Sequence, residues 1–119
     1  MKRLLIVDDE TKICDLLARF FTSLGFQTST AQSGRQALAM LDGGAPDYLL
    51  LDIRMPDVSG LEVLRQAKSR HPSLKVVMVT ALADSDTMDE AFRCGAADYV
   101  TKPLAFSDQA WARAFFTSS

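Results

Sequence analysis

The chain is poor in the residues that build metal clusters and disulfide frameworks. It contains only two cysteines, Cys14 and Cys94, and one histidine, His71. The cysteines are far apart and belong to no Cys-x-x-Cys motif, so neither a zinc site nor a redox motif is indicated. We expect both to be core or helix-end thiols. His71 lies beside Pro72 in a polar stretch and is expected to be a surface residue.

Long apolar runs are also missing. No stretch approaches the roughly 18 apolar residues of a membrane span. The first apolar run, Leu4 to Val7, is followed by three acids and is too short for a signal peptide. We therefore expect a cytoplasmic protein. The formal net charge of −2 and the pI near 5.2 give no long-range attraction to nucleic acid or to anionic membranes, so a partner should be a protein or a small molecule.

What the sequence does contain is a regular alternation of short apolar runs and helical patterns. The apolar runs are Leu4–Val7, Tyr48–Leu51, Val76–Val79 and Ala97–Val100, and Phe26–Ala31, with Thr28 and Thr30 among small residues, predicts a weaker second strand. Runs of this length without polar alternation fit strands that helices cover on both faces. Five strand-then-helix units predict a parallel sheet with right-handed crossovers. We expect residues 1–119 to form a single doubly wound α/β domain of three layers.

The predicted helices have recognisable faces and ends. In the first helix, apolar residues recur at helical spacing and predict one buried stripe. These residues are Ile13, Leu16, Leu17, Phe20, Phe21 and Leu24. Gly25 is a predicted stop, and Ser33 is a predicted N-cap of the second helix. Asp84 and Asp86 are expected to cap the fourth helix, and the third helix should end near His71 because Pro72 follows. Ser107 is the expected cap of a fifth helix that carries Ala110, Trp111, Ala114 and Phe115.

Polar side chains stand where the predicted strands end. They are Asp8 and Asp9 after the first strand, Asp52 after the third, Thr80 at the end of the fourth and Lys102 after the fifth. The carboxyl ends of parallel strands share one edge, where ligands collect in open α/β sheets. Converging carboxylates repel, so at neutral pH they either raise a pKa or recruit a cation. A site made only of oxygen ligands suits Mg²⁺.

These residue types match the needs of phosphoryl transfer. That reaction requires a nucleophile, a metal, and donors for the charge on the phosphoryl oxygens. Asp52 is the predicted nucleophile and would form an aspartyl phosphate. Asp8 and Asp9 would hold the metal, Lys102 would pair with a phosphate oxygen, and the Thr80 hydroxyl would hydrogen-bond another. Each residue alone has a simpler interpretation as a helix cap, strand residue or surface charge; their conjunction favours a site.

With these motifs, the chain resembles the receiver domain of two-component response regulators, and in particular the chemotaxis-regulator-like receivers. The resemblance covers roughly residues 1–104, and its motifs lie at residues 8–10, 52–60, 80–81, 95–99 and 102–103. It implies a flavodoxin-like sheet of five strands in the order 2-1-3-4-5. It also implies a cis peptide bond before Pro103.

The resemblance further implies a function. A sensor histidine kinase or a phosphotransfer protein would pass its phosphoryl group to Asp52. Mg²⁺ would be bound by Asp9, Asp52 and the backbone carbonyl of Arg54, with Asp8 acting mainly through water. The domain would assist only its own phosphorylation and dephosphorylation, and so would not be an enzyme in the usual sense.

The implied output is a two-state switch. The residue matching Thr80 moves toward the phosphoryl group while the aromatic matching Tyr99 turns inward. The surface of the fourth helix, fifth strand and fifth helix then changes and acts on a downstream output domain or protein. The family also allows a phosphorylation-dependent dimer. Direct binding of nucleic acid or membrane by this domain is not expected.

Three other classes compete with the switch. A phosphohydrolase with an aspartyl-phosphate intermediate would need a substrate pocket, and 119 residues leave little room for a cap domain. A flavin binder on the same fold would need a phosphate-binding loop where the chain has three acids, Asp8 to Glu10. A pseudo-receiver that binds proteins without being phosphorylated remains the alternative, although every catalytic position is filled.

Overall fold

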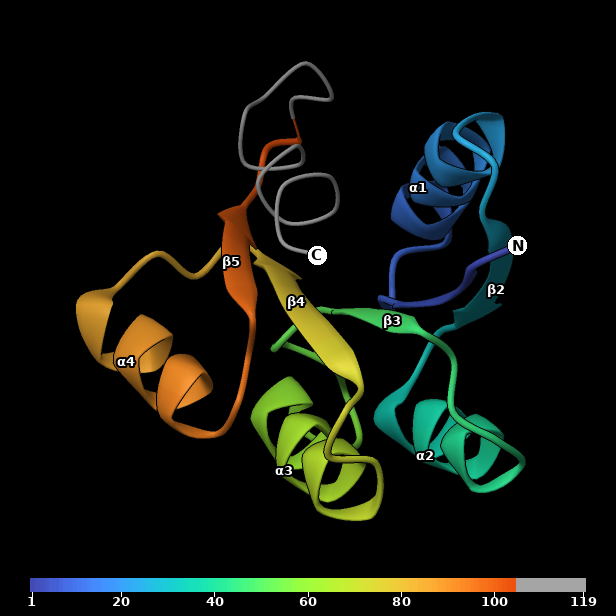
Figure 1. The fold of residues 1–119 in the computed structure, drawn as a ribbon. Helices are drawn as coiled ribbons and strands as arrows, with labels where there is room; N and C mark the ends of the chain where they lie inside the picture. The colour runs from blue at the N-terminus through green and yellow to red at the C-terminus, as the bar shows by residue number, and fades with distance from the viewer. Residues whose placement is uncertain (105–119) are drawn as a thin grey trace.

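The structure is a computed structural model that describes residues 1–104, and its centre is a sheet of five parallel strands (Figure 1). The strands are β1 (Arg3–Val7), β2 (Gln27–Ala31), β3 (Tyr48–Leu51), β4 (Lys75–Thr80) and β5 (Asp98–Thr101). Their order in the sheet is β2-β1-β3-β4-β5, as predicted. The expected fifth helix and its Ser107 cap lie outside the described residues.

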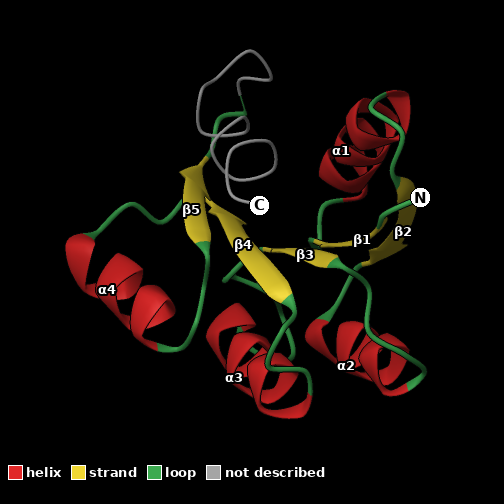
Figure 2. Cartoon of the chain, viewed as in Figure 1, coloured by secondary structure: helices red, strands yellow, loops and turns green. Residues whose placement is uncertain are grey.

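Four described helices cover the two faces of this sheet. They are α1 (Thr11–Ser23), α2 (Gly34–Asp42), α3 (Gly60–Arg70) and α4 (Ser85–Arg93). Helix α1 lies on one face, and α2, α3 and α4 lie on the other (Figure 2). The predicted layering is therefore confirmed for the described part of the chain. None of the helices described within residues 1–104 is long and apolar enough to span a membrane.

The core consists of two clusters, one on each face of the sheet. Leu5 and Val7 of β1 point toward α2 and α3, whereas Leu4 and Ile6 point toward α1. Successive side chains of a strand alternate between faces, and here both faces are covered, so the strand sequence is continuously apolar. Burial of one such side chain contributes about 1.5–3 kcal/mol.

The ends of the helices follow the predicted capping chemistry. The Ser33 hydroxyl accepts a hydrogen bond from the Gln36 amide at 3.1 Å, and the Asp84 carboxylate accepts one from the Thr87 amide at 3.0 Å. Gly25, just beyond α1, has a φ of 95°, a conformation that favours glycine. The peptide bond between Lys102 and Pro103 is cis, as the resemblance implied.

The predicted buried face of α1 was right only in part. Leu17 and Phe21 are buried, and Cys14 is a core thiol as expected, but Leu16 is 45% exposed and Leu24 is 44% exposed. The buried side of α1 carries Cys14, Leu17 and Phe21, and the Cys14 thiol lies 3.2 Å from the carbonyl oxygen of Asp8, next to the end of β1. A pattern of six apolar positions covers a wider arc than one sheet face can bury.

Candidate functional site

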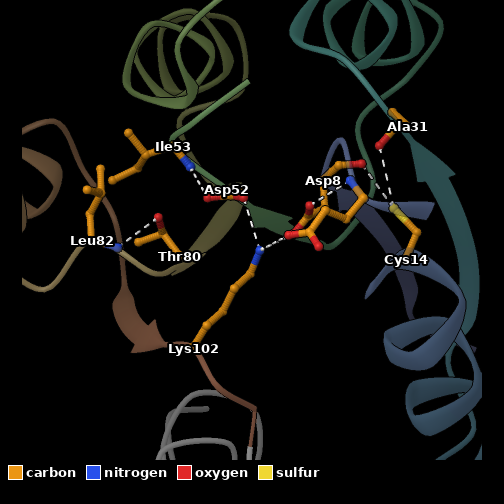
Figure 3. Close-up of polar contacts among 9 residues, drawn as sticks. Asp8, Cys14, Ala31, Asp52, Ile53, Thr80, Leu82 and Lys102 are labelled. Atoms are coloured by element: carbon orange, nitrogen blue, oxygen red, sulfur yellow. Dashed lines mark hydrogen bonds and ion pairs between the residues drawn. The ribbon is translucent and has the colours of Figure 1, made fainter. Parts of the chain in front are cut away.

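The residues predicted to converge do meet at the carboxyl edge of the sheet (Figure 3). The backbone amide of Asp52 donates to the carbonyl of Val7 at 3.0 Å, which sets the end of β3 beside the end of β1. The amide of Lys102 donates to the carbonyl of Thr80 at 2.9 Å and does the same for β5 and β4. Hydrogen bonds that continue the parallel ladder thus hold the four strand ends in register.

Three polar side chains at this edge are withdrawn from solvent. Asp8, Asp52 and Thr80 are the buried polar or charged residues of the described chain. Asp8 and Thr80 are each only 1% exposed and Asp52 is 6% exposed. A buried carboxylate is costly unless a cation or hydrogen-bond donors compensate it, so this arrangement indicates a functional site.

Lys102 supplies part of that compensation. Its Nζ atom lies 2.7 Å from Oδ2 of Asp8 and 3.1 Å from Oδ2 of Asp52, with Oε1 of Glu10 at 3.6 Å. Burial raises the pKa of Asp8 above 3.8 more than the hydrogen bond from Lys102 lowers it. Burial opposes the charge of Lys102, but its hydrogen bonds to the two carboxylates outweigh this effect and raise its pKa.

A cation could complete the compensation. Carboxylate oxygens of Asp8, Asp9 and Asp52 lie within 4.8 Å of one another, and Asp9 is exposed at the entrance. Asp9 and Asp52 line a cavity of about 310 Å³ together with Glu10, Arg54, Thr80, Ala81 and Lys102. Oxygen ligands beside open space for water are the conditions that Mg²⁺ prefers, so the residues present fit this ion.

The Asp52 carboxylate has a defined orientation. One of its oxygens, Oδ1, accepts a hydrogen bond from the Ile53 amide at 2.7 Å, and the other faces Lys102. Gly60 packs directly under this point, because a Cβ atom there would lie 2.0 Å from the carbonyl oxygen of Asp52. Gly60 is the last residue of the motif at residues 52–60, but its steric role could not be inferred from the sequence.

The two expected switch residues are joined through the backbone of Leu82. The Thr80 hydroxyl accepts a hydrogen bond from the Leu82 amide at 3.3 Å, and the Tyr99 hydroxyl donates to the Leu82 carbonyl at 2.7 Å. Tyr99 is buried, so its ring points inward in this structure. Burial, with Asp84 and Asp52 nearby, raises its pKa.

Sequence reasoning missed two further contacts at the site. The Cys14 thiol donates to the carbonyl oxygen of Asp8 at 3.2 Å and so connects α1 to the β1–α1 loop. The carboxylate of Asp57 accepts hydrogen bonds from the amides of Gly34 and Arg35, both at 3.0 Å. Both contacts connect segments whose proximity follows only from the folded chain.

A doubly wound sheet that carries an acidic cluster and a lysine at its carboxyl edge defines a recognisable class of signalling domain. The family described as "Response regulator receiver domain" matches residues 4–110. The chain belongs to this family of two-component systems, and the predicted family and fold are thereby confirmed.

Similar proteins include bacterial response regulators. The "Regulatory protein AtoC" of Escherichia coli (strain K12) is 43% identical over 104 residues, which are 87% of this chain and 23% of that protein. The "DNA-binding transcriptional regulator NtrC" of Klebsiella pneumoniae is 45% identical over 99 residues, 83% of this chain and 21% of that protein. The chain thus spans less than a quarter of the length of these relatives.

Solved structures share the fold. A receiver domain protein (CheY-like) from Methanospirillum hungatei JF-1 is 32% identical, with a TM-score of 0.87 over 92% of this chain and 87% of that one. The response regulator protein TrrA from Thermotoga maritima, in complex with Mg(2+)-BeF, is 34% identical, with a TM-score of 0.85 over 95% of this chain and 96% of that one.

Proposed function

We propose that residues 1–119 form one receiver domain that accepts a phosphoryl group on Asp52 from a phosphohistidine of a sensor histidine kinase or phosphotransfer protein. The observation that carries this proposal is the placement of Asp52. Its carboxylate is buried, lies 3.1 Å from the Lys102 ammonium and has carboxylate oxygens of Asp8 and Asp9 within 4.8 Å. An oxygen of Asp52 forms the new P–O bond while the P–N bond breaks and its electron pair returns to the imidazole.

Each neighbour has a role in this transfer. Asp9, Asp52 and the backbone carbonyl of Arg54, with Asp8 mainly through water, would hold Mg²⁺, and the ion would supply positive charge beside the phosphoryl oxygens. Lys102 exchanges part of its contact with the carboxylates for a phosphoryl oxygen, and so keeps its charge compensated throughout. The Thr80 hydroxyl donates to another oxygen.

The output follows from the Leu82 contacts. When the Thr80 hydroxyl turns to the phosphoryl group, the Leu82 amide loses its acceptor, and the loop that also binds Tyr99 changes its preferred conformation. The surface of α4 and β5, together with the fifth helix that the sequence predicts, is the proposed output surface, acting on a downstream domain or protein. AtoC and NtrC extend well beyond the matched part, which supports an output domain.

Several properties follow from this role. The domain turns over no external substrate and acts only on its own phosphoryl group. It works in the cytoplasm, where its kinase partner presents the phosphohistidine, and binds neither nucleic acid nor membrane directly. Dimerisation upon phosphorylation would be one form of output.

The test is intact mass after incubation with a small-molecule phosphodonor and Mg²⁺. We expect one added phosphoryl group that disappears with EDTA and in Asp52→Asn. Asp42→Asn is the matched control, because Asp42 is an exposed acid at the far end of α2 and should leave the addition unchanged. Addition to Asp52→Asn as efficient as to wild type would refute the assignment. A folded wild type that accepts no phosphoryl group from the donor or a phosphorylated kinase would support the pseudo-receiver.

A further inference from the structure

We propose that Asp57 is a positioning residue for the metal site. Its carboxylate fastens the β3–α3 loop, residues 52–59, to the N-terminus of α2, and thereby sets the position of Arg54 beside the acidic cluster. This inference rests on the proposed function, because it concerns the backbone carbonyl that would help to hold Mg²⁺. In the described hydrogen bonds, Asp57 itself contacts the amides of Gly34 and Arg35 and no residue of the acidic cluster.

The contact is a two-point attachment. Oδ1 of Asp57 accepts from the Gly34 amide and Oδ2 accepts from the Arg35 amide, each at 3.0 Å. The first amides of a helix lack partners within the helix, and the positive end of the helix favours an anion. The N-cap Ser33 satisfies a different amide, that of Gln36. Helix α2 is therefore capped twice, once by its own residue and once by the loop.

The backbones at this contact lie close together. A Cβ atom on Gly34 would lie 2.8 Å from Cβ of Val58 and 2.9 Å from its carbonyl oxygen, so only glycine allows the loop to approach α2 in this way. The backbone hydrogen bonds from Arg35, Val58 and Gly34 lower the pKa of Asp57 from 3.8 to about 2. The carboxylate is consequently ionised, and the attachment holds, throughout the physiological range.

The attachment affects Arg54, because this residue lies between the two points at which the loop is fixed. At its base, the Gly60 amide donates to the Ile53 carbonyl at 2.8 Å. Between this bond and Asp57 lies Arg54, an exposed residue that lines the cavity with Asp9 and Asp52. A loop fixed at both ends has fewer conformations to lose when its carbonyl binds an ion, so the attachment favours binding.

The experiment compares Mg²⁺ affinity in the full chain by titration calorimetry, without phosphodonor. We expect Asp57→Ala to weaken binding on the order of tenfold, the scale of lost outer-shell support. Asp57→Asn should weaken it less, since its amide oxygen keeps one acceptor. Ser33→Ala is the matched control: it removes the other cap of the same helix, leaves the loop attachment in place, and should leave the affinity unchanged.

A metal-free readout gives a second measure. Amide hydrogen exchange at Arg54 and Met55 should accelerate in Asp57→Ala and stay at the wild-type rate in Ser33→Ala. Wild-type affinity and exchange in Asp57→Ala would overturn the inference, and so would an equal loss in Ser33→Ala, which would assign the effect to α2 alone. Failure of the proposed function looks different: the wild type then binds no Mg²⁺ or gains no phosphoryl mass.

Discussion

At the residue scale, the buried charge of Asp8 is a large part of the energetic penalty of forming the site. It is almost completely buried and lies near Asp52, another carboxylate, and Lys102 compensates the two only in part. Burial of the charge and the neighbouring carboxylate both disfavour the ionised form, which is why the pKa of Asp8 is raised. The buried Asp8 carboxylate therefore lowers the stability of the fold when no ion is bound.

We therefore expect Asp8→Asn to stabilise the metal-free protein. The amide keeps the shape of the side chain and removes the buried charge, which should raise the free energy of unfolding by roughly 0.5–2 kcal/mol. Urea unfolding at neutral pH in EDTA measures this difference. Excess Mg²⁺ should shrink it, because the ion stabilises only the wild type well. A less stable Asp8→Asn in EDTA would show that the Lys102 ion pair outweighs the burial cost.

Gly60 makes a second prediction at this scale. Its Cβ would collide with the backbone of Asp52 and Ile53, which cannot move aside as a flexible side chain could. We expect Gly60→Ala to lower the free energy of unfolding by about 1–3 kcal/mol or more and to reduce phosphorylation of Asp52. Gly43→Ala is the control: the nearest atom is 3.5 Å away and φ is −80°, so it should be tolerated. Equal stability of the two variants would contradict the steric role.

The predictability of single residues depended on where they stand relative to the strands. Asp8, Asp52, Thr80 and Lys102 each follow or end an apolar run, so a parallel sheet places them together as predicted. The role of Asp57 could not be predicted in this way, because its partners lie 22 and 23 positions away in a helix whose distance from the loop depends on packing.

At the element scale, α1 shows how packing selects among apolar residues. Its apolar positions cover more of the helix than the sheet can bury, and the buried arc runs through Cys14, Leu17 and Phe21. The pattern predicted the helix and its ends well, yet it could not predict which edge of the stripe faces solvent.

Two alanine variants test this orientation. Phe21→Ala removes a fully buried ring and should cost about 3–5 kcal/mol of unfolding free energy. Leu16→Ala removes a half-exposed side chain and should change it by less than about 1 kcal/mol, partly because alanine favours the helix. Urea denaturation gives both values. A larger loss in Leu16→Ala than in Phe21→Ala would show that Leu16 is buried and would contradict this orientation of α1.

The attachment of the β3–α3 loop to α2 makes the stability depend on pH. The pKa of Asp57 is about 2 in the folded protein and near 3.8 in an unfolded chain, so its ionised form stabilises the fold above about pH 4. This contribution is lost as the pH falls from 3.8 toward 2. The stability gap between wild type and Asp57→Asn should therefore be constant from neutral pH to about pH 4 and shrink below it.

Urea unfolding at successive pH values checks this expectation. The gap between wild type and Ser33→Ala serves as the control, since the serine cap does not titrate and its gap should stay constant over the same range. An Asp57→Asn gap that grows on acidification would contradict the assigned direction.

At the scale of the whole molecule, the residues of the site come from several strands of the same sheet. Asp8, Asp52, Thr80 and Lys102 come from the ends of β1, β3, β4 and β5, and both core clusters span the sheet. An ion or phosphoryl group at this edge would therefore interact with residues from the ends of four strands. Because the site exists only in the folded chain, its occupation should stabilise the entire domain.

We expect the 119-residue chain to unfold in one cooperative transition that Mg²⁺ shifts as a whole. At a free concentration one hundred times its dissociation constant, the ion should add about 2.7 kcal/mol to the free energy of unfolding. Circular dichroism during urea titration, with and without EDTA, measures the shift. Asp9→Asn should reduce it by weakening the site, and an undiminished shift in this variant would place the ion elsewhere.

The sequence by itself determined the strands, most helix ends, the order of the sheet through its family motifs, and the group of residues at the carboxyl edge. These depend on periodicity, capping and the fixed direction of parallel strands, which are local or topological properties. Only the tertiary structure decided that Leu16 is left half-exposed, that Gly60 supports Asp52, and that Asp57 joins a loop to α2. Such contacts depend on the distances between packed elements, and those distances arise only when all side chains fill the same volume.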